Sequence, residues 1–290
     1  MNFKKYRSRF LLVFATLTLL FSSVLLTSCQ GKKIKNTVFS VDDLAGKTIG
    51  VQLGTTGDTL VSDYETDGSG TTVSRYNKGS DAIQALKQGK ADAVVIDEQP
   101  ALAFVKANPD LTILEEEFAN EDYAICVAKG NSLTAKLNEA IEVLMADGTI
   151  QKLIDDYVGD NATFSGYKSP DGISRTNGTL VMATNAYFKP YEYDEGGSIM
   201  RIDAHIAHAI AHYLAMNLKI EDMEFDSIIT AVSSGKADFG MAGMTVTDER
   251  KKNIDFTTTY TTSKQVIIVR DDNASSSGMS FAEKFKTDFI

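Results

Sequence analysis

The chain has 290 residues, enough for one large or two modest domains that each bury a core. Hydrophobic residues make up 43% of it and charged residues 23%, which is typical of globular proteins. A formal net charge of −10 argues against a broad surface for nucleic acid. Two cysteines are too few for a disulfide scaffold or a four-thiolate zinc site.

The first 28 residues have the layout of an export signal. Four basic residues precede an apolar run from Phe10 to Leu26, which ends Leu26-Thr27-Ser28-Cys29. This ending resembles a bacterial lipoprotein signal, in which Cys29 receives the lipid, so residues 1–28 are expected to be removed and 29–37 to form a polar tether. The alternative is an uncleaved membrane anchor. Both interpretations place the remainder outside the cytoplasm, and the first attaches it by lipid to the outer face of the cell membrane or leaves it periplasmic.

Strands and helices are predicted to alternate downstream, which favours an α/β fold. Residues 160–178 lack apolar periodicity and are interpreted as a surface linker between two blocks. In the first block the predicted strands are 47–52, 91–96 and 123–128, and the predicted helices are 80–88, 101–106 and 133–157, with LGTTG opening one more. In the second, the predicted strands are 179–184, 219–222, 237–241 and 265–270, and the predicted helices are 203–214 and 226–233.

The two blocks share a short repeated sequence pattern. Residues 85–92 (ALKQGKAD) and 231–238 (AVSSGKAD) each combine a helix end, a glycine stop and a new strand. Two similar units are one interpretation, and a recurrent helix-to-strand turn is the other. The following strands end at Asp97 and at Gly243–Thr245, and ligands of open α/β sheets bind beyond the carboxyl ends of strands.

Longer motifs carry a family resemblance. VQLGTTG, VIDEQP, GMTVTDERKKNIDF and the strand QVIIVR resemble bacterial extracytoplasmic solute-binding proteins of family 3, which deliver polar amino acids to ATP-binding-cassette (ABC) importers. Residues 179–270 resemble the amino-terminal half of that family, and residues 38–159 resemble its carboxy-terminal half.

The swapped order implies a circularly permuted, two-lobed periplasmic-binding-protein-like (type II) α/β fold. Lobe one is expected to contain residues 124–159 and 179–259, and lobe two residues 38–118 and 265–271, with hinges at 119–123 and 260–264. A remnant of tandem domains and a swapped dimer remain alternatives. Residues 272–290 resemble a segment leading into a fused permease, which implies that the chain is the front of such a fusion; an ordinary amphipathic helix is the alternative.

The resemblance implies a ligand site for an amino acid, whose carboxylate needs a cation and whose ammonium needs an acid. Arg250 matches the family arginine that grips the carboxylate; a helix-surface arginine is its alternative role. Gly243 and Thr245 match positions that add backbone groups and a hydroxyl. Thr55, Thr56 and Gly57 follow a strand and open a helix, an arrangement that suits an anion or serves as a plain cap.

Asp97 matches the acid that pairs with the ligand ammonium, whereas Glu98 is expected to be an exposed neighbour. Phe188 and Phe225 match aromatic walls around the ligand, although aromatic residues more often belong to a core. Asn185 stands where many relatives carry Asp, which puts a strongly cationic preference in doubt. Arg201 and Ile202 replace the usual Gly-Phe, so the start of that helix is expected to be altered.

Three histidines, His205, His208 and His212, have a helical spacing that could suit zinc ligands, but no cysteine or acid motif completes a site, so no metal site is predicted. The resemblance implies charged surface residues at these helix positions. Cys126 is expected to be a small buried hydrophobic residue.

These features predict a non-enzymatic binding component of an ABC importer, without a cofactor, whose partners are an amino acid and the permease subunits, with the ATPase an indirect partner. Hinge closure around the ligand would accompany binding. An amino-acid-sensing ectodomain is the main alternative, and an enzyme on the same fold or a non-binding gene remnant are further ones.

Overall fold

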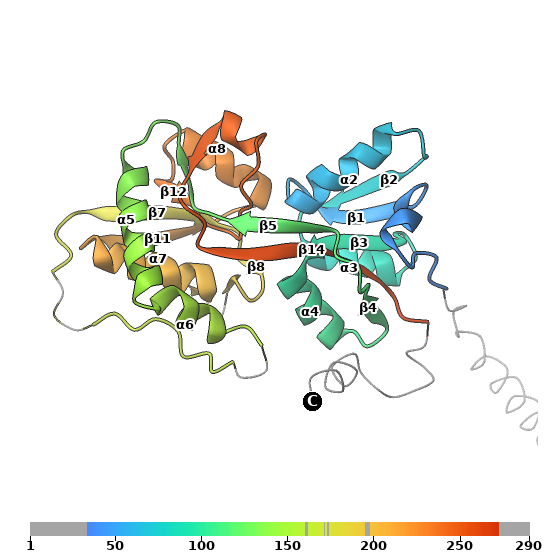
Figure 1. Cartoon of the computed structure of the whole chain (residues 1–290), viewed down its shortest axis with the longest axis horizontal. Coiled ribbons are helices and arrows are strands. Elements are labelled where there is room, and N and C mark those ends of the chain that lie inside the picture. The colour runs from blue at the N-terminus through green and yellow to red at the C-terminus, as the bar shows by residue number, and fades with distance from the viewer. Residues whose placement is uncertain (1–33, 160–161, 171, 173, 195–197, 273–290) are drawn as a thin grey trace, which may run out of the picture. The chain divides into compact units, whose positions relative to one another are not determined.

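A computed structural model describes residues 34–159, 162–170, 172, 174–194 and 198–272, and its fold is mixed α/β (Figure 1). Two mixed sheets, named sheet A and sheet B, contain most of the strands. The strands of a small antiparallel sheet, named sheet C, pair only with one another. The predicted signal, Cys29 and the tail beyond Asp272 lie outside the described residues.

Sheet A has the strand order β2-β1-β3-β14-β4, with β5 pairing to β14. Strands β2, β1 and β3 run parallel to one another, whereas β14 is antiparallel to β3, β4 and β5. The strands are β1 (Thr48–Gln52), β2 (Thr72–Tyr76), β3 (Ala93–Asp97), β4 (Leu111–Ile113), β5 (Ala119–Tyr123) and β14 (Thr261–Arg270). The helices packed with them are η1 (Val41–Leu44), α2 (Thr56–Thr66), α3 (Gly79–Lys87) and α4 (Glu98–Ala107).

The sequence of β3, AVVID, explains its central place in sheet A, because every residue of this strand is buried. Ala93 and Val95 join a core with residues of η1 and α2, whereas Val94 and Ile96 join a core with residues of α3 and α4. A continuous apolar strand with helices on both faces brings its last residue, Asp97, to the edge where ligands of such sheets bind.

Sheet B has the strand order β11-β7-β12-β6-β13. Here β7 is parallel to β11 and β12, while β6 runs antiparallel to β12 and β13. Its strands are β6 (Cys126–Ala128), β7 (Thr179–Thr184), β11 (Asn217–Asp222), β12 (Phe239–Gly240) and β13 (Ile254–Phe256). The associated helices are α5 (Leu133–Ala146), α6 (Thr149–Asp155), α7 (Ile202–Tyr213), η2 (Phe225–Ser227), α8 (Ile228–Ser233) and η3 (Arg250–Lys252).

The two faces of sheet B bury separate cores. Leu180 and Met182 of β7 join the larger one with α5, α6 and α7, and Ala183 joins the other with residues of α8. Sheet C, formed by β8 (Tyr187–Phe188), β9 (Glu192–Asp194) and β10 (Ile199–Met200), comes between β7 and α7 in the chain.

Strand β14 pairs with three strands along its length, β5, β3 and β4 (Figure 1). Its first half pairs with β5, from Thr261 opposite Tyr123 to Gln265 opposite Ala119. From Gln265 onward it pairs with β3, where Gln265 stands opposite Asp97. The β5 strand ends at Tyr123, which forms an isolated bridge to Thr245 next to sheet B. Gln265 is therefore placed where β3 and β5 meet.

Several predicted elements need correction. The predicted helix 133–157 is two helices, because Gly148 adopts a left-handed conformation (φ 80°) between α5 and α6. The predicted strand 123–128 is also divided, since β5 pairs in sheet A and β6 in sheet B. Strands β2, β4, β8, β9, β10 and β13 were not predicted. The predicted strands 91–96, 179–184 and 219–222 are confirmed to within two residues as β3, β7 and β11.

The segment predicted as a surface linker packs partly on the fold. Thr163 and Ser165 donate hydrogen bonds to the Asp156 carboxylate, each at 2.7 Å, and the Phe164 N–H donates to the Asp156 carbonyl at 2.8 Å. Tyr167 packs against the large core of sheet B. The polar composition of this segment therefore gave no indication of these specific contacts.

Candidate functional site

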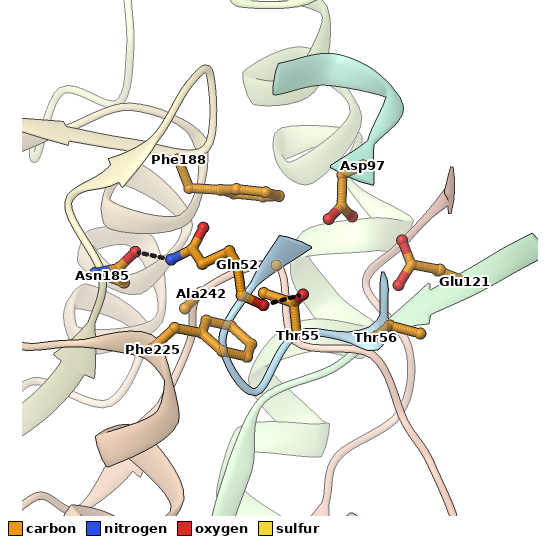
Figure 2. Close-up of a pocket in the computed structure, with 10 residues that line it drawn as sticks. Gln52, Thr55, Thr56, Asp97, Glu121, Asn185, Phe188, Phe225 and Ala242 are labelled. Atoms are coloured by element: carbon orange, nitrogen blue, oxygen red, sulfur yellow. Dashed lines mark hydrogen bonds between the residues drawn. The ribbon is translucent and has the colours of Figure 1, made fainter. Parts of the chain in front are cut away.

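A small cavity lies where residues of both sheets converge. Its volume is about 10 Å³, which is room for about one water molecule. The lining residues come from β1 and the start of α2, from β3 and β5, and from the loops around β7, β8, η2 and β12. They are Gln52, Thr55, Thr56, Asp97, Glu121, Asn185, Phe188, Phe225, Ala242 and Gly243 (Figure 2).

Arg250 lies next to this cavity in the short turn η3 and is only 7% exposed. Its guanidinium donates to the Thr245 carbonyl at 2.7 Å, the Gly54 carbonyl at 3.0 Å and Thr56 Oγ1 at 3.5 Å. The Phe225 ring centroid lies 5.4 Å from the guanidinium carbon. Each of these hydrogen-bond acceptors is neutral, so the buried charge can still accept an anion as a partner.

Hydrogen bonds join the two sides of the cavity directly. Thr56 donates to Thr245 Oγ1 at 2.9 Å, and the Gln52 side chain donates to Asn185 Oδ1 at 3.0 Å. Both pairs are buried, and each couples a residue beside sheet A to one beside sheet B. A ligand larger than water therefore requires these contacts to open.

The opposite part of the cavity is acidic. Asp97 is 5% exposed and Glu121 is 3% exposed. Tyr123 donates its hydroxyl proton to Asp97 Oδ1, while Gln265 Nε2 donates to Asp97 Oδ2 at 3.0 Å and to Glu121 Oε2 at 2.9 Å. Burial, and then the charge of Glu121, holds the pKa of the Asp97 carboxyl well above its usual range.

Gly243 owes its position to a buried carboxylate behind the cavity. Its backbone N–H donates to Asp203 Oδ2 at 2.8 Å, and the Tyr260 hydroxyl donates to the same carboxylate at 2.9 Å. Gly243 has φ 54°, and an added Cβ would lie 2.6 Å from the Phe188 ring. Only glycine fits this close approach of backbone to ring.

Phe188 and Phe225 both line the cavity and form its apolar part. Figure 2 shows the two rings on opposite sides of the Gln52 side chain. Phe188 also stacks on Tyr191, with ring centroids 5.5 Å apart, and packs against the large core of sheet B. The rings are thus partly core residues and partly lining residues.

The structure brings most of the predicted site residues together. Those that line the cavity are Thr55, Thr56, Asp97, Asn185, Phe188, Phe225 and Gly243. Thr245 and Arg250 adjoin it through their bonds to Thr56. Gly57 does not line it; a Cβ there would lie 2.7 Å from Gln265 Oε1, so this glycine serves the close packing of α2 on β3 and β14. Glu98 is half-buried rather than exposed and pairs with Lys264 at 3.1 Å.

Three lining residues were not predicted: Gln52, Glu121 and Ala242. Gln52 is a polar residue at the end of the otherwise buried strand β1, which is the signal that could have found it. Glu121 alternates with exposed neighbours in β5 and shares its face with the buried Tyr123. The sequence shows that alternation but not which face is buried.

The histidines do not lie on a charged helix surface as expected. His205 is buried and stacks on Tyr157 at 5.6 Å between centroids, and His212 Nδ1 contacts the Tyr167 hydroxyl. Burial lowers the pKa of His205 to about 4 and also lowers that of His208. Tyr157 and Tyr167, which follow α6, contact the rings of His205 and His212. Among the described ranges, no group of three or more metal-ligating side chains is found.

Cys126 is fully buried in β6, as predicted, and burial raises its pKa to about 12.

The start of α7 differs from an ordinary helix start, since Arg201 at its N-cap has φ 119°. In the part of the chain that the structure describes, no helix is both long and apolar enough to span a bilayer.

Comparison with known proteins finds a family similarity in the second half of the chain. Residues 180–286 match bacterial extracellular solute-binding proteins, family 3. The arginine-binding extracellular protein ArtP of Bacillus subtilis is 40% identical over 94 residues, which are 32% of this chain and 37% of that protein. The L-cystine-binding protein TcyJ of Escherichia coli is 33% identical over 135 residues, or 44% of this chain and 48% of that protein.

Among solved structures, an ancestral arginine-binding protein bound to arginine is 43% identical, covering 44% of this chain and 57% of its own, with a TM-score of 0.40. The chain spans about half or less of the length of the two curated relatives described above.

Proposed function

We propose that this protein is the extracytoplasmic binding component of an ABC importer and that it captures an amino acid at the cavity between sheets A and B. The observation that carries the proposal is the placement of buried charged groups around the cavity. Arg250, which forms no ion pair with an acid among the described residues, lies beside one part of it, and two buried carboxyl groups line another. A zwitterion complements this arrangement, because each of its charges meets the opposite charge.

Arg250 is proposed to hold the ligand carboxylate. Its bond to the Gly54 carbonyl and its contact with Thr56 cross from sheet B to sheet A, so separation of the two sides would free N–H groups of the guanidinium. Thr245, Thr55, Thr56, Gly57 and Gly243 are proposed to add hydroxyl and backbone groups. Closure on the ligand then replaces neutral acceptors with a bidentate carboxylate.

Asp97 is proposed to take the ligand ammonium, and Phe188 and Phe225 to pack on its carbon stem. Gln52 and Asn185 would have to separate for that stem to enter, since they are hydrogen-bonded across the cavity. The present volume of about 10 Å³ is far below the roughly 300–1,000 Å³ of typical ligand sites. Binding therefore involves opening of the two sides about the strands β5 and β14.

The order of the two halves supports a circular permutation of the family fold. The Asn36 N–H donates to both carboxylate oxygens of Asp272, at 3.1 and 3.2 Å, so the two ends of the described region lie side by side. Joining 272 to 36 and opening the chain within 160–178 would give the family's usual order. Neighbouring surface ends make such a rearrangement inexpensive.

The membrane attachments belong to the same proposal. Cys29 would carry a lipid that tethers the protein outside the cytoplasm, and the segment after Asp272 would lead toward a permease. The permease subunits are the proposed protein partners, and no covalent chemistry or cofactor is required for capture and delivery.

The test is calorimetric titration of the purified chain with the twenty amino acids, starting with arginine and cystine because relatives are named for them. We expect one or a few to bind and to raise the melting temperature. Arg250→Ala should weaken binding by about 30-fold or more, since truncating one partner of a buried charge pair costs about 2–5 kcal/mol.

Lys251→Ala is the matched control, because the neighbouring lysine is exposed and bonds only surface groups. It should bind as the unmodified chain does. An Arg250→Ala protein that folds normally and keeps its affinity would remove Arg250 from the site, and a folded chain that binds no amino acid would refute the function.

A further inference from the structure

Two buried carboxyl groups share one end of the cavity, and only one of them, Asp97, is assigned to the ligand above. Glu121 comes from β5, and Asp97 is the last residue of β3. Figure 2 shows the two carboxyl groups turned toward each other, and both line the cavity. They are brought together because β3 and β5 pair with successive parts of β14.

The hydrogen-bond partners of this carboxyl pair are neutral donors. Gln265 Nε2 is shared between the two groups, Tyr123 serves Asp97, and Thr245 Oγ1 donates to Glu121 Oε1 at 2.5 Å. Gln265 is fully buried, and its own Oε1 has no hydrogen-bond partner within the described ranges. A single amide N–H₂ group therefore bridges two acids that would otherwise repel each other.

The charged and titratable groups around the pair do not neutralise it. Arg250 interacts with both carboxyls at a distance, but its hydrogen bonds go to Thr245, Gly54 and Thr56. Tyr123, Tyr191 and Glu192, the other titratable groups that interact with the pair, can add only negative charge. The adjacent Glu98 is paired with Lys264 at 3.1 Å.

Two ionised carboxylates buried this close are costly when no cation is hydrogen-bonded to them, and such pairs retain one proton. Burial and the neighbouring Glu121 both raise the pKa of Asp97, in agreement with this geometry.

We propose that Glu121 is the second carboxylate of the ammonium-binding end of the site, and that the Asp97–Glu121 pair gives up one shared proton when a ligand ammonium binds between them. The inference rests on the proposed function. An ammonium has three N–H donors and can serve both carboxylates at once. Its charge replaces that of the proton, which passes to the solvent, so charge and atoms balance.

The measurement is calorimetry of the full chain with its best-binding amino acid in buffers of different ionisation enthalpy, below the pKa of the ligand ammonium. We expect about one proton released per ligand bound. The affinity should rise by up to about tenfold per pH unit and then level off above the apparent pKa of the pair. Binding with no proton exchange at any pH would overturn the inference while leaving the proposed function intact.

A pair of variants assigns the proton. Glu121→Gln keeps the size and polarity of the side chain but removes the second acid, so proton release and the pH dependence of affinity should both become smaller. Glu98→Gln is the control, because Glu98 neighbours Asp97 without lining the cavity, and it should release the proton as before. Full proton release in a folded Glu121→Gln protein would exclude Glu121 from the pair.

The outcomes for the two proposals are distinct. If the unmodified chain binds no amino acid at all, the proposed function fails and this inference fails with it. If it binds and releases a proton but Glu121→Gln fails to fold, Glu121→Ala in the same buffers decides the matter. Loss of proton release in that variant supports the pair, and persistence of the release refutes it.

Discussion

Arg201 occupies a backbone conformation that residues other than glycine rarely adopt. As the N-cap residue of α7 it has φ 119° and ψ −164°, a region essentially restricted to glycine. Its guanidinium lies 5.4 Å from the ring centroids of Tyr157 and Phe164, and these contacts partly offset the strain. The resemblance to a family with glycine here predicts an altered helix start, and Arg201 holds a backbone conformation suited to glycine.

This strain gives a matched pair of substitutions. Arg201→Ala and Arg201→Gly both lose the ring contacts, but only glycine relieves the backbone. We therefore expect the glycine variant to be more stable than the alanine variant by about 1–3 kcal/mol. Urea unfolding of both variants measures the difference. Equal stabilities would mean that the backbone at this position is not strained.

At the scale of elements, short and polar segments were the hardest to predict. Strand β2 (TVSRY) buries only Val73 fully, so its sequence carries no clear alternation. Strand β14 is four residues longer than its predicted core, because its first residues are polar and pair with β5. Glu121 was missed for the same reason, since its burial depends on that pairing. In contrast, the wholly buried β3 was recognisable from sequence alone.

The segment that follows α6 is anchored by one carboxylate. Asp156 accepts hydrogen bonds from Lys152, Thr163 and Ser165, and these lower its pKa to about 2. A depressed carboxyl pKa stabilises the fold above the unfolded-state value of 3.8, and the contribution is lost as the pH falls from about 4 toward 2.

Asp156→Asn should therefore destabilise the protein at pH 7 by about 1 kcal/mol, a small value because the Lys152 partner is largely in water. The difference from the unmodified chain should shrink as the pH approaches 3. Denaturant unfolding at both pH values measures it, with Asp155→Asn as the exposed control. A difference that stays constant with pH would show that the Asp156 charge does not anchor the segment.

At the scale of the whole molecule, the family motifs predicted the arrangement of the site better than the outline of each element. Motifs from both halves of the chain specify Thr56, Asp97, Gly243 and Arg250, which the structure gathers around one cavity or beside it. The size of the cavity and the direct bonds across it could not be predicted, because they depend on side-chain contacts between distant segments. The contacts that cover His205 and His212 could not be predicted for the same reason.

Both sheets contain strands from both halves of the chain. Strand β14 lies between β3 and β4 in sheet A, and β6 lies between β12 and β13 in sheet B. Neither half completes a sheet alone, so the connection through 160–178 is one of two possible covalent links. The other is a short join between Asp272 and Asn36, which are already hydrogen-bonded.

A rearranged chain tests whether the order of the halves is a permutation of one fold. It would run from 174 to 272, continue through a few Gly and Ser residues into 36, and end at 159. Because every strand pairing is preserved and the new loop is short, we expect a monomer whose stability lies within about 2 kcal/mol of the present order. It should bind the same amino acid with similar affinity in calorimetry. A rearranged chain that is unfolded or dimeric, while the present order is a folded monomer, would show that the 160–178 connection is itself required for the fold.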